Sequence, residues 1–142
     1  SVANNGEMVK PVFTRQSNLI SNKTVLNPSI CSDDTLEKVK LMLENVVNEK
    51  GGTGYNIKSK IYKIAGKTGT GQVDYNTDNM QYISSFVGYF PANKPKYSCI
   101  VVIHKPNKKK GYYGATVAAP VFKEIADKIY SLTPELVNYN KC

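Results

Sequence analysis

The residues of this chain that are best suited to chemistry stand together at Lys67, Thr68, Gly69 and Thr70. The lysine ammonium supplies positive charge, the two threonine hydroxyls supply hydrogen-bond donors, and the glycine leaves the main chain free of a side chain. Together these groups suit the carboxylate end of an extended peptide that lies against the backbone. The motif falls within residues 65–72, which the sequence places between two predicted β-strands.

No part of the sequence offers a nucleophile paired with a base. The single histidine, His104, ends a predicted strand, where we expect it to pack or to face solvent rather than to act as a base. The three cysteines, Cys31, Cys99 and Cys142, have neither the spacing of a CxxC metal pair nor that of a disulfide framework, although one disulfide is left open. Cys99 fits a strand as a small buried hydrophobe. We therefore expect no metal and no cofactor, and we interpret the motif at 67–70 as one wall of an active site.

The tripeptide Gly66-Lys67-Thr68 also matches the end of a phosphate-binding P-loop. That motif requires a glycine five residues before Gly66, where Ile61 stands. No helix is predicted to follow the lysine, so no helix N-terminus would face a phosphate. Both observations argue against nucleotide binding.

The chain has 142 residues, of which 41% are hydrophobic, and this is enough to fill the core of one domain. Its longest apolar run, residues 99–103, has the length of a strand and is far shorter than a membrane span. Residues 1–6 lack the basic start and apolar middle of a signal peptide. A targeting or anchoring segment upstream is left open.

The formal net charge of +8 has two interpretations. The lysines that cluster around one predicted hairpin and the loop after it are Lys94, Lys96, Lys105, Lys108, Lys109 and Lys110. They would either bind an anionic partner, such as nucleic acid, an acidic membrane surface or a wall polymer, or simply solvate strand edges and turns. Nucleic-acid modules usually alternate basic residues with stacking aromatics, and this cluster is mostly lysine and proline. The second interpretation is therefore favoured, and no nucleic-acid partner is expected.

The first regular element that the sequence predicts is a helix beginning near Asp34. Asp34 and Glu37 form a capping-box pattern, and Gly51-Gly52 ends the helix. Its apolar residues recur at helical spacing, at Leu36, Val39, Leu43, Val46 and Val47. Residues 1–33 are expected to be irregular, with a turn at Asn5-Gly6.

Three strands and a second helix are predicted in the remainder of the chain. The strands are residues 60–66, 81–90 and 97–105, of which the last two form a hairpin. Apolar side chains on both faces of the last strand indicate a sheet that is covered on both sides. The closing helix is predicted over about 115–130, with Pro120 near its start or bending it.

Several blocks of this sequence resemble, in order, the C-terminal part of the transpeptidase domain of class B penicillin-binding proteins. The first is Lys-Thr-Gly-Thr at 67–70, a known motif of penicillin-binding proteins and β-lactamases. The second is Tyr-Ile-Ser-Ser-Phe-Val-Gly-Tyr-Phe-Pro at 82–91, and the third is Tyr-Tyr-Gly-Ala-Thr-Val-Ala-Ala-Pro-Val-Phe at 112–122. Residues 2–6 and 9–11 resemble the segment that precedes these blocks. The resemblance covers residues 1 to about 130.

The resemblance implies an α+β fold, in which helices pack on an antiparallel sheet with three strands retained. It also implies a reaction without a cofactor. In that family a serine attacks the D-Ala-D-Ala end of a peptidoglycan stem peptide, D-alanine leaves, and an amine of a second stem peptide takes the acyl group. β-Lactams acylate the same serine. The expected location is the extracytoplasmic face of a bacterial inner membrane, with an anchor upstream.

The resemblance also assigns roles to the four residues of the motif. Lys67 would hold the substrate carboxylate, Thr68 and Thr70 would donate hydroxyl hydrogen bonds to it, and Gly69 would let the peptide approach the strand. The Thr70 N–H would be one of two donors of an oxyanion hole, with the serine's own N–H as the other. Gln72 is at most a residue of the cleft rim.

Two further motifs of the family, Ser-x-x-Lys and Ser-x-Asn, do not occur in this sequence. We therefore expect residues 1–142 to be a single fragment, the C-terminal portion of a transpeptidase domain, that is catalytically incomplete alone. Residues 131–142 are expected to form a loose tail. The strand at 97–105 should expose an unpaired edge with apolar surface beside it, to be closed by the missing N-terminal part of the domain or by a second copy.

Other interpretations of the motif are kept open. The chain could be a non-enzymatic module that binds peptide or wall polymer, or, less favoured, a basic nucleic-acid-binding domain. A β-lactamase is compatible with the tripeptide alone. The aromatic strand and the helix at 112–122 resemble the transpeptidases more closely.

Overall fold

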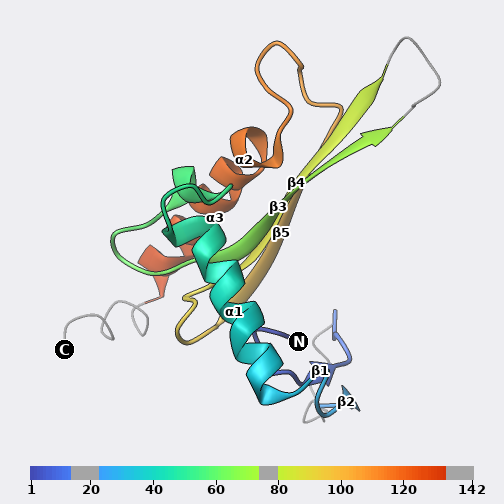
Figure 1. The fold of residues 1–142 in the computed structure, drawn as a ribbon, viewed down its shortest axis with the longest axis vertical. Coiled ribbons are helices and arrows are strands. Elements are labelled where there is room, and N and C mark those ends of the chain that lie inside the picture. The colour runs from blue at the N-terminus through green and yellow to red at the C-terminus, as the bar shows by residue number, and fades with distance from the viewer. Residues whose placement is uncertain (14–22, 74–79, 134–142) are drawn as a thin grey trace. The chain divides into compact units, whose positions relative to one another are not determined.

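The structure is a computed structural model that describes residues 1–13, 23–73 and 80–133. Figure 1 shows the order of its helices and strands along the chain. The chain divides into two compact units, Ser1–Met42 and Leu43–Cys142. Each unit is described by itself.

The first unit is more regular than the sequence predicted. Strand β1 (Met8–Val9) pairs antiparallel with β2 (Val25–Asn27). The expected turn at Asn5-Gly6 is confirmed, since both residues have positive φ angles, of 53° and 83°. Glycine adopts this left-handed conformation without steric cost.

Helix α1 (Asp33–Asn48) begins one residue earlier than predicted, and its cap is a different residue. Ser32, not Asp34, caps it: the Thr35 N–H donates to Ser32 Oγ at 3.4 Å, and the Leu36 N–H donates to the Ser32 carbonyl at 2.9 Å. Asp34 instead lies in the first turn, where a carboxylate is favourable next to the positive end of the helix dipole.

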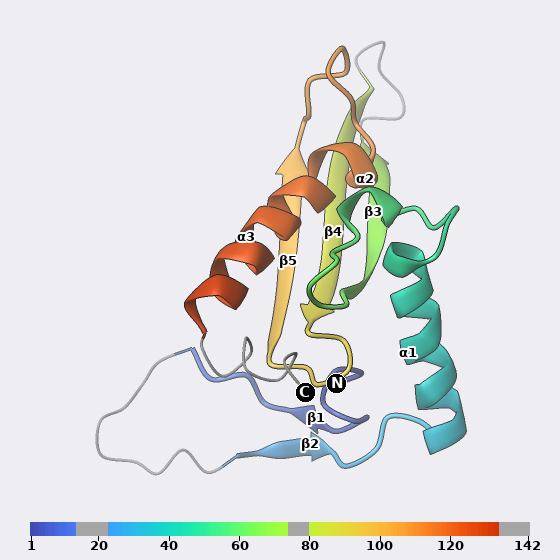
Figure 2. The same ribbon diagram turned by 90° about the vertical axis from the view of Figure 1, so that its left-hand side faces the viewer.

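The second unit is built on one antiparallel sheet. Its strands are β3 (Ala65–Val73), β4 (Gln81–Phe90) and β5 (Tyr97–His104), in the order β3-β4-β5 (Figure 2). Together with the helices packed on it, this sheet confirms the predicted α+β class.

The strand predicted at 60–66 is wrong in position, because the strand begins only at Ala65. The motif at 67–70 therefore lies within a strand rather than after one. Glycine and threonine in this segment resemble turn residues, yet every residue from Ala65 to Val73 pairs with β4, and this long-range pairing determines the conformation. Tyr62 and Ile64 are buried, although they belong to no strand.

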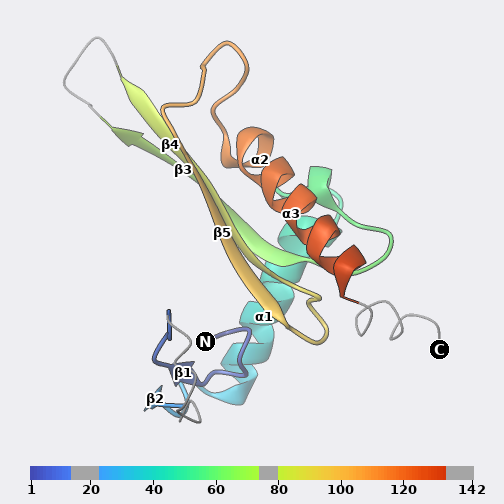
Figure 3. The same ribbon diagram turned by 180° about the vertical axis from the view of Figure 1, so that it is seen from behind.

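The predicted closing helix is divided into two. Helix α2 (Gly114–Val117) and helix α3 (Ala119–Leu132) lie on the same face of the sheet (Figure 3). Pro120 occupies the first turn of α3, as predicted, where its missing N–H has no helical partner to lose. The expected tail at 131–142 overlaps the last turn of α3, and residues 134–142 lie outside the described part of the chain.

The core of the second unit lies between the sheet and α3. The Phe122 ring contacts the rings of Phe86 and Phe90 in β4, with centroid distances of 4.8 and 5.8 Å. The buried cluster consists of Val47, Ile57, Tyr62, Ile64, Phe86, Phe90, Val101, Ala118, Ala119, Phe122, Ala126 and Tyr130.

In the part of the chain that the structure describes, the opposite face of the sheet is open, contrary to the prediction of cover on both sides. Val87 is 49% exposed, Ile100 64% and Val102 42%. In the described part of the chain β5 pairs only with β4, so its outer edge is unpaired, as predicted.

The lysines predicted to cluster form two groups at opposite ends of β5. Lys94 and Lys96 precede this strand, and the others follow it, in the segment 105–110. A strand of eight residues is about 26 Å long, so the two groups do not form one patch.

Three further observations concern the described residues only. Cys31 and Cys99 are free thiols, and burial raises the pKa of the half-buried Cys99 thiol. The residues that the structure describes include no helix long and apolar enough to span a membrane, and no cluster of metal-ligating side chains. Cys142 lies outside them.

Candidate functional site

All four residues of the sequence motif lie on the accessible part of β3. Side chains alternate along a strand, so Lys67 and Gly69 belong to the open face of the sheet, whereas Thr68 and Thr70 belong to the face covered by the helices. Lys67 and Thr70 are exposed, and the two residues between them are half-buried. The motif is therefore neither inside the core nor on a helix.

The Lys67 ammonium lies beside the outer edge of β3. Its Nζ donates to the Thr68 carbonyl at 2.9 Å and to Thr68 Oγ1 at 3.3 Å. An ammonium has three N–H donors, so at least one is left for a ligand. The positive charge is thus placed at the strand edge.

The Thr68 hydroxyl is held from the segment that follows α1. Thr53 Oγ1 lies 3.0 Å from Thr68 Oγ1. The next residue, Gly54, donates its N–H to the Val46 carbonyl at 2.8 Å, which attaches this turn to the end of α1.

The Thr70 hydroxyl is held from the other side, by the start of α2. The Gly114 N–H donates to Thr70 Oγ1 at 3.1 Å. Because the hydroxyl accepts this bond, its own proton is left to donate to another group. Gly114 sits so close to the sheet that an added Cβ would lie 2.3 Å from the Ser85 carbonyl oxygen and 2.5 Å from that of Gly69.

The outer edge of β3 is a free hydrogen-bonding edge. β3 pairs with β4 on one side, and no strand in the described residues pairs with it on the other. In an antiparallel ladder the N–H and C=O of one residue point the same way, and the direction alternates along the strand. The Thr68 carbonyl accepts from Lys67 Nζ at this edge, so the N–H and C=O of Thr68 and Thr70 point outward.

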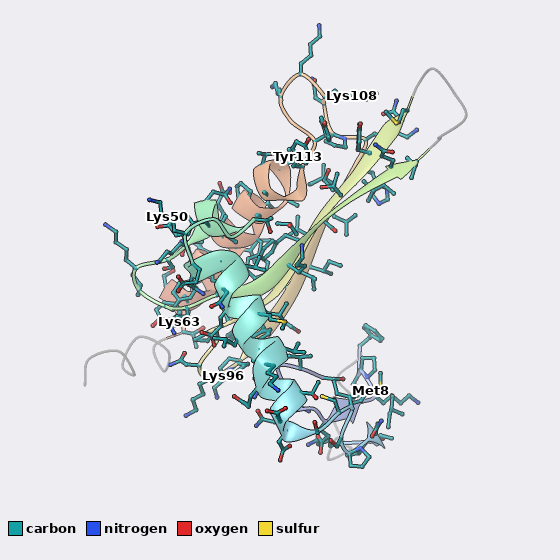
Figure 4. The ribbon with its side chains drawn as sticks, viewed as in Figure 1. Met8, Lys50, Lys63, Lys96, Lys108 and Tyr113 are labelled. Atoms are coloured by element: carbon teal, nitrogen blue, oxygen red, sulfur yellow. The ribbon has the colours of Figure 1, made fainter. Side chains whose placement is uncertain are left out.

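A cavity of about 380 Å³ adjoins the Thr70 end of the motif. Its lining residues are Thr70, Gly71, Gln72, Tyr82, Tyr112 and Tyr113. The Tyr82 and Tyr112 rings stack with centroids 4.1 Å apart. Figure 4 shows Tyr113 at the start of α2 and Lys108 on the loop before it.

Hydrogen bonds fix the tyrosines of this cavity. Tyr112 Oη donates to Tyr113 Oη at 3.1 Å, and Ser84 Oγ donates to the Tyr112 carbonyl. The hydrogen bond to Tyr113 and the proximity of that phenol raise the pKa of Tyr112 to about 12. The Tyr112 phenol is therefore neutral at physiological pH.

Sequence reasoning missed this cavity. The sequence placed Tyr82, Tyr112 and Tyr113 in blocks that resemble the family, and none of them was predicted to belong to the site. The available signal was the Tyr-Tyr-Gly block after a lysine-rich loop, but its position beside Thr70 depends on the fold. Gln72, expected at the rim, is exposed and lines the cavity, and His104 is exposed at the end of β5.

The comparisons with known proteins agree with the family resemblance found in the sequence. The family model of the penicillin binding protein transpeptidase domain matches residues 1–127. The chain is 36% identical over 122 residues to the peptidoglycan D,D-transpeptidase FtsI of Buchnera aphidicola subsp. Baizongia pistaciae. The aligned region covers 80% of this chain and 21% of that protein. It is 33% identical over 127 residues to the probable peptidoglycan D,D-transpeptidase PenA of Neisseria flavescens, covering 87% of this chain and 30% of the relative.

A solved structure shows the same fold. The apo structure of the TP domain from Burkholderia pseudomallei penicillin-binding protein 3 superposes with a TM-score of 0.71 at 32% identity, covering 93% of this chain and 39% of that one. The chain spans less than a third of the length of each of the two curated relatives described above. On the family match and these identities, the chain belongs to the penicillin-binding protein transpeptidase family and corresponds to part of a class B transpeptidase domain.

Proposed function

We propose that this chain supplies the β3 wall of the active site of a peptidoglycan D,D-transpeptidase. In this proposal the outer edge of β3 binds the D-Ala-D-Ala end of a stem peptide as an added strand. The observation that supports it most strongly is the free edge of β3, where the backbone of Thr68 and Thr70 points outward beside the Lys67 ammonium.

Each group of the motif has a role in this proposal. Lys67 attracts the terminal carboxylate. The Thr70 hydroxyl accepts a hydrogen bond from the Gly114 N–H, so its own proton can be donated to the same carboxylate. Gly69 has no side chain, which leaves room for the peptide on the open face of the sheet. An added Cβ at this position would lie 2.6 Å from Ser85 Oγ, closer than a normal contact.

The Thr70 N–H would act on the reacting carbonyl. A serine oxygen supplied from outside this sequence attacks the carbonyl carbon of the penultimate D-alanine, and negative charge develops on the carbonyl oxygen. The C–N bond to the last D-alanine then breaks, the leaving nitrogen takes the proton that the serine hydroxyl gave up, and the penultimate D-alanine remains as an ester on the serine. An amine of a second stem peptide then attacks this ester, forms a new amide bond and returns a proton to the serine oxygen. An outward-pointing N–H at the oxyanion is worth about 2.7–4 kcal/mol of transition-state stabilisation.

The first experiment measures peptide binding to the chain itself. The anisotropy of fluorescein-labelled D-Ala-D-Ala should rise with protein concentration, and the C-terminal carboxamide of the same peptide should bind more weakly. Lys67→Met should weaken binding of the carboxylate peptide about tenfold, because it removes a charge-assisted hydrogen bond. The matched control is Lys63→Met, an exposed lysine paired with Glu44 instead. Equal affinity for carboxylate and carboxamide would contradict the proposal.

The second experiment tests the claim that the chain does not acylate alone. Positioned donors without a nucleophile form no covalent intermediate. Intact-mass spectrometry after incubation with a fluorescent penicillin should therefore show the unmodified mass. A penicilloyl adduct would prove that a nucleophile is present in this chain, and the division of roles proposed above would be wrong.

A further inference from the structure

The start of α2 presents a backbone donor to the candidate site. This inference rests on the proposed function, in which the Thr70 hydroxyl donates to the peptide carboxylate. That hydroxyl accepts the Gly114 N–H at 3.1 Å, so the position of Gly114 decides where the remaining proton of the hydroxyl points. Helix α2 has only four residues and no side-chain cap of its own. Its first turn must therefore be held in place by other elements.

Ser84 in β4 holds the chain two residues before Gly114. Its hydroxyl donates to the Tyr112 carbonyl. Ser84 is fully buried, and a buried hydroxyl that lacks a hydrogen bond is unfavourable, so the fold depends on this bond. The main chain at Tyr112 is thereby tied to the centre of the sheet.

The register of the sheet makes this contact part of a closed ring. Ser84 is the residue of β4 that pairs with Thr70, and side chains of paired residues lie on the same face. Ser84 bonds the Tyr112 carbonyl, and the Gly114 N–H returns to the Thr70 hydroxyl. A change at Ser84 therefore shifts the segment that carries the Gly114 N–H.

Asn56 holds the residue after Gly114 from a different element. It lies in the short 3₁₀ helix η1 (Tyr55–Ile57), and its Nδ2 donates to the Ala115 carbonyl at 2.7 Å. Burial of Ile57 fixes η1 in the core. The Gly114 N–H thus lies between two side-chain contacts, one from the sheet and one from η1.

We propose that Ser84 and Asn56 are positioning residues for recognition of the terminal carboxylate. They place the Gly114 N–H against the Thr70 hydroxyl, and the proton of that hydroxyl is then directed to the peptide. Both act through Thr70 rather than on the peptide itself. The buried Ser84 has the larger effect, and the exposed Asn56 the smaller, because water can replace an exposed hydrogen bond.

The first measurement is a ratio of two affinities for the whole chain. Acetyl-D-Ala-D-Ala and its C-terminal carboxamide are titrated separately and followed by NMR. Ser84→Ala should reduce the preference for the carboxylate about threefold, and Asn56→Ala about twofold, since a charge-assisted hydrogen bond weakens as its alignment is lost. The matched control is Tyr62→Phe. It removes the hydroxyl of another buried residue, which donates to Asp127 at 2.7 Å, and it should keep the preference.

A double-mutant cycle separates positioning from a general loss of stability. Thr70→Val removes the hydroxyl and keeps the shape of the side chain. In that background Ser84→Ala should leave the preference unchanged, because the group through which Ser84 acts is gone. An equal loss of preference in both backgrounds would overturn the inference.

The Gly114 amide proton gives a second readout that needs no ligand. Its NMR resonance should move in Ser84→Ala and in Asn56→Ala, and it should stay in place in Tyr62→Phe. If Ser84→Ala does not fold, Asn56→Ala carries the test, since its side chain is exposed. An unchanged Gly114 resonance together with an unchanged preference in Asn56→Ala would overturn the inference.

The outcomes also distinguish this inference from the proposed function. Peptide binding that is weakened by Lys67→Met but indifferent to Ser84→Ala and Asn56→Ala would refute the positioning role and leave the β3 site intact. No binding of either peptide by the unaltered chain would refute both.

Discussion

The Gly114 N–H orients the Thr70 hydroxyl by donating a hydrogen bond to it. Gly114 can lie this close to the sheet only because it has no side chain. An added Cβ would lie 2.3 Å from the Ser85 carbonyl oxygen, and neither this backbone atom nor that of Gly69 can move without disturbing the ladder. The donor for Thr70 and the close packing of α2 on the sheet therefore rest on one residue.

This arrangement gives a prediction for stability. Gly114→Ala should lower the free energy of unfolding by about 2–3 kcal/mol, because overpacking forces the backbone apart. The matched control is Gly71→Ala, whose Cβ would meet only the Ile83 carbonyl oxygen, at 3.9 Å, and should change stability by less than about 0.5 kcal/mol. Urea unfolding followed by circular dichroism measures both. Equal effects of the two substitutions would contradict the packing described here.

A second residue-scale prediction concerns Tyr112. The pKa of this phenol is raised from its ordinary value of 10.0 to about 12, first by its hydrogen bond to Tyr113. A raised pKa means that the folded state holds the proton more tightly than the unfolded state does. The contribution of this phenol to the free energy of unfolding is therefore complete below pH 10 and is lost as the pH rises from 10 to 12. Tyr113→Phe should lower the pKa of Tyr112 toward 10.

The measurement is the pH titration of the Cζ resonance of Tyr112 by NMR, assigned with a Tyr112→Phe variant. Tyr55→Phe, which alters a tyrosine outside the cavity, should leave the titration unchanged. Titration of Tyr112 near pH 10 in the unaltered chain would show that the bond between the two hydroxyls does not form in solution.

At the scale of elements, the largest fully buried side chain of α3 packs against two rings of β4. Phe122 is fully buried between Phe86 and Phe90. Phe122→Ala should destabilise the fold by about 3–5 kcal/mol, since it leaves a cavity that the sheet cannot fill. Leu132→Ala, in the same helix but 68% exposed, should cost less than about 0.5 kcal/mol. A loss below about 1 kcal/mol for Phe122→Ala in urea unfolding would mean that α3 does not pack as described.

The sequence was most informative where its local pattern and the fold agree. The strand predicted at 81–90 coincides with β4 at both ends. The motif at 67–70 lies on an accessible strand, and its role as a binding site stays a prediction. The sequence failed where long-range contacts decide: β3 is a strand because β4 pairs with it, and its glycines resemble a turn. Ser32 and Asp34 are both good caps, and only the geometry selects Ser32.

The parts of the site that the sequence did not predict are joined across long separations. The bond from Gly114 to Thr70 spans 44 residues, and the stack of Tyr82 on Tyr112 spans the whole β4–α2 segment. No local pattern encodes such contacts. The tyrosine cavity could be found only once the sheet and α2 were placed.

At the scale of the whole molecule, the open face and free edge of β5 predict association. Exposed apolar residues beside an unpaired strand favour pairing with another chain. Size-exclusion chromatography with light scattering should show a mass above that of the monomer as concentration rises. Ile100→Lys should reduce this association, and Leu132→Lys, which also replaces an exposed apolar residue, should not. A strictly monomeric chain at high concentration would show that this edge needs no partner.

In the proposed function the outer edge of β3 binds the carboxyl end of a peptide, with Lys67 and the Thr70 N–H as its main groups. The most direct test is the ¹⁵N NMR spectrum of the chain during titration with acetyl-D-Ala-D-Ala. The amide resonances of Thr68 and Thr70 should shift with increasing peptide, and Lys67→Met should suppress these shifts. Saturable shifts confined to other parts of the chain, or none at millimolar peptide, would contradict the proposed function.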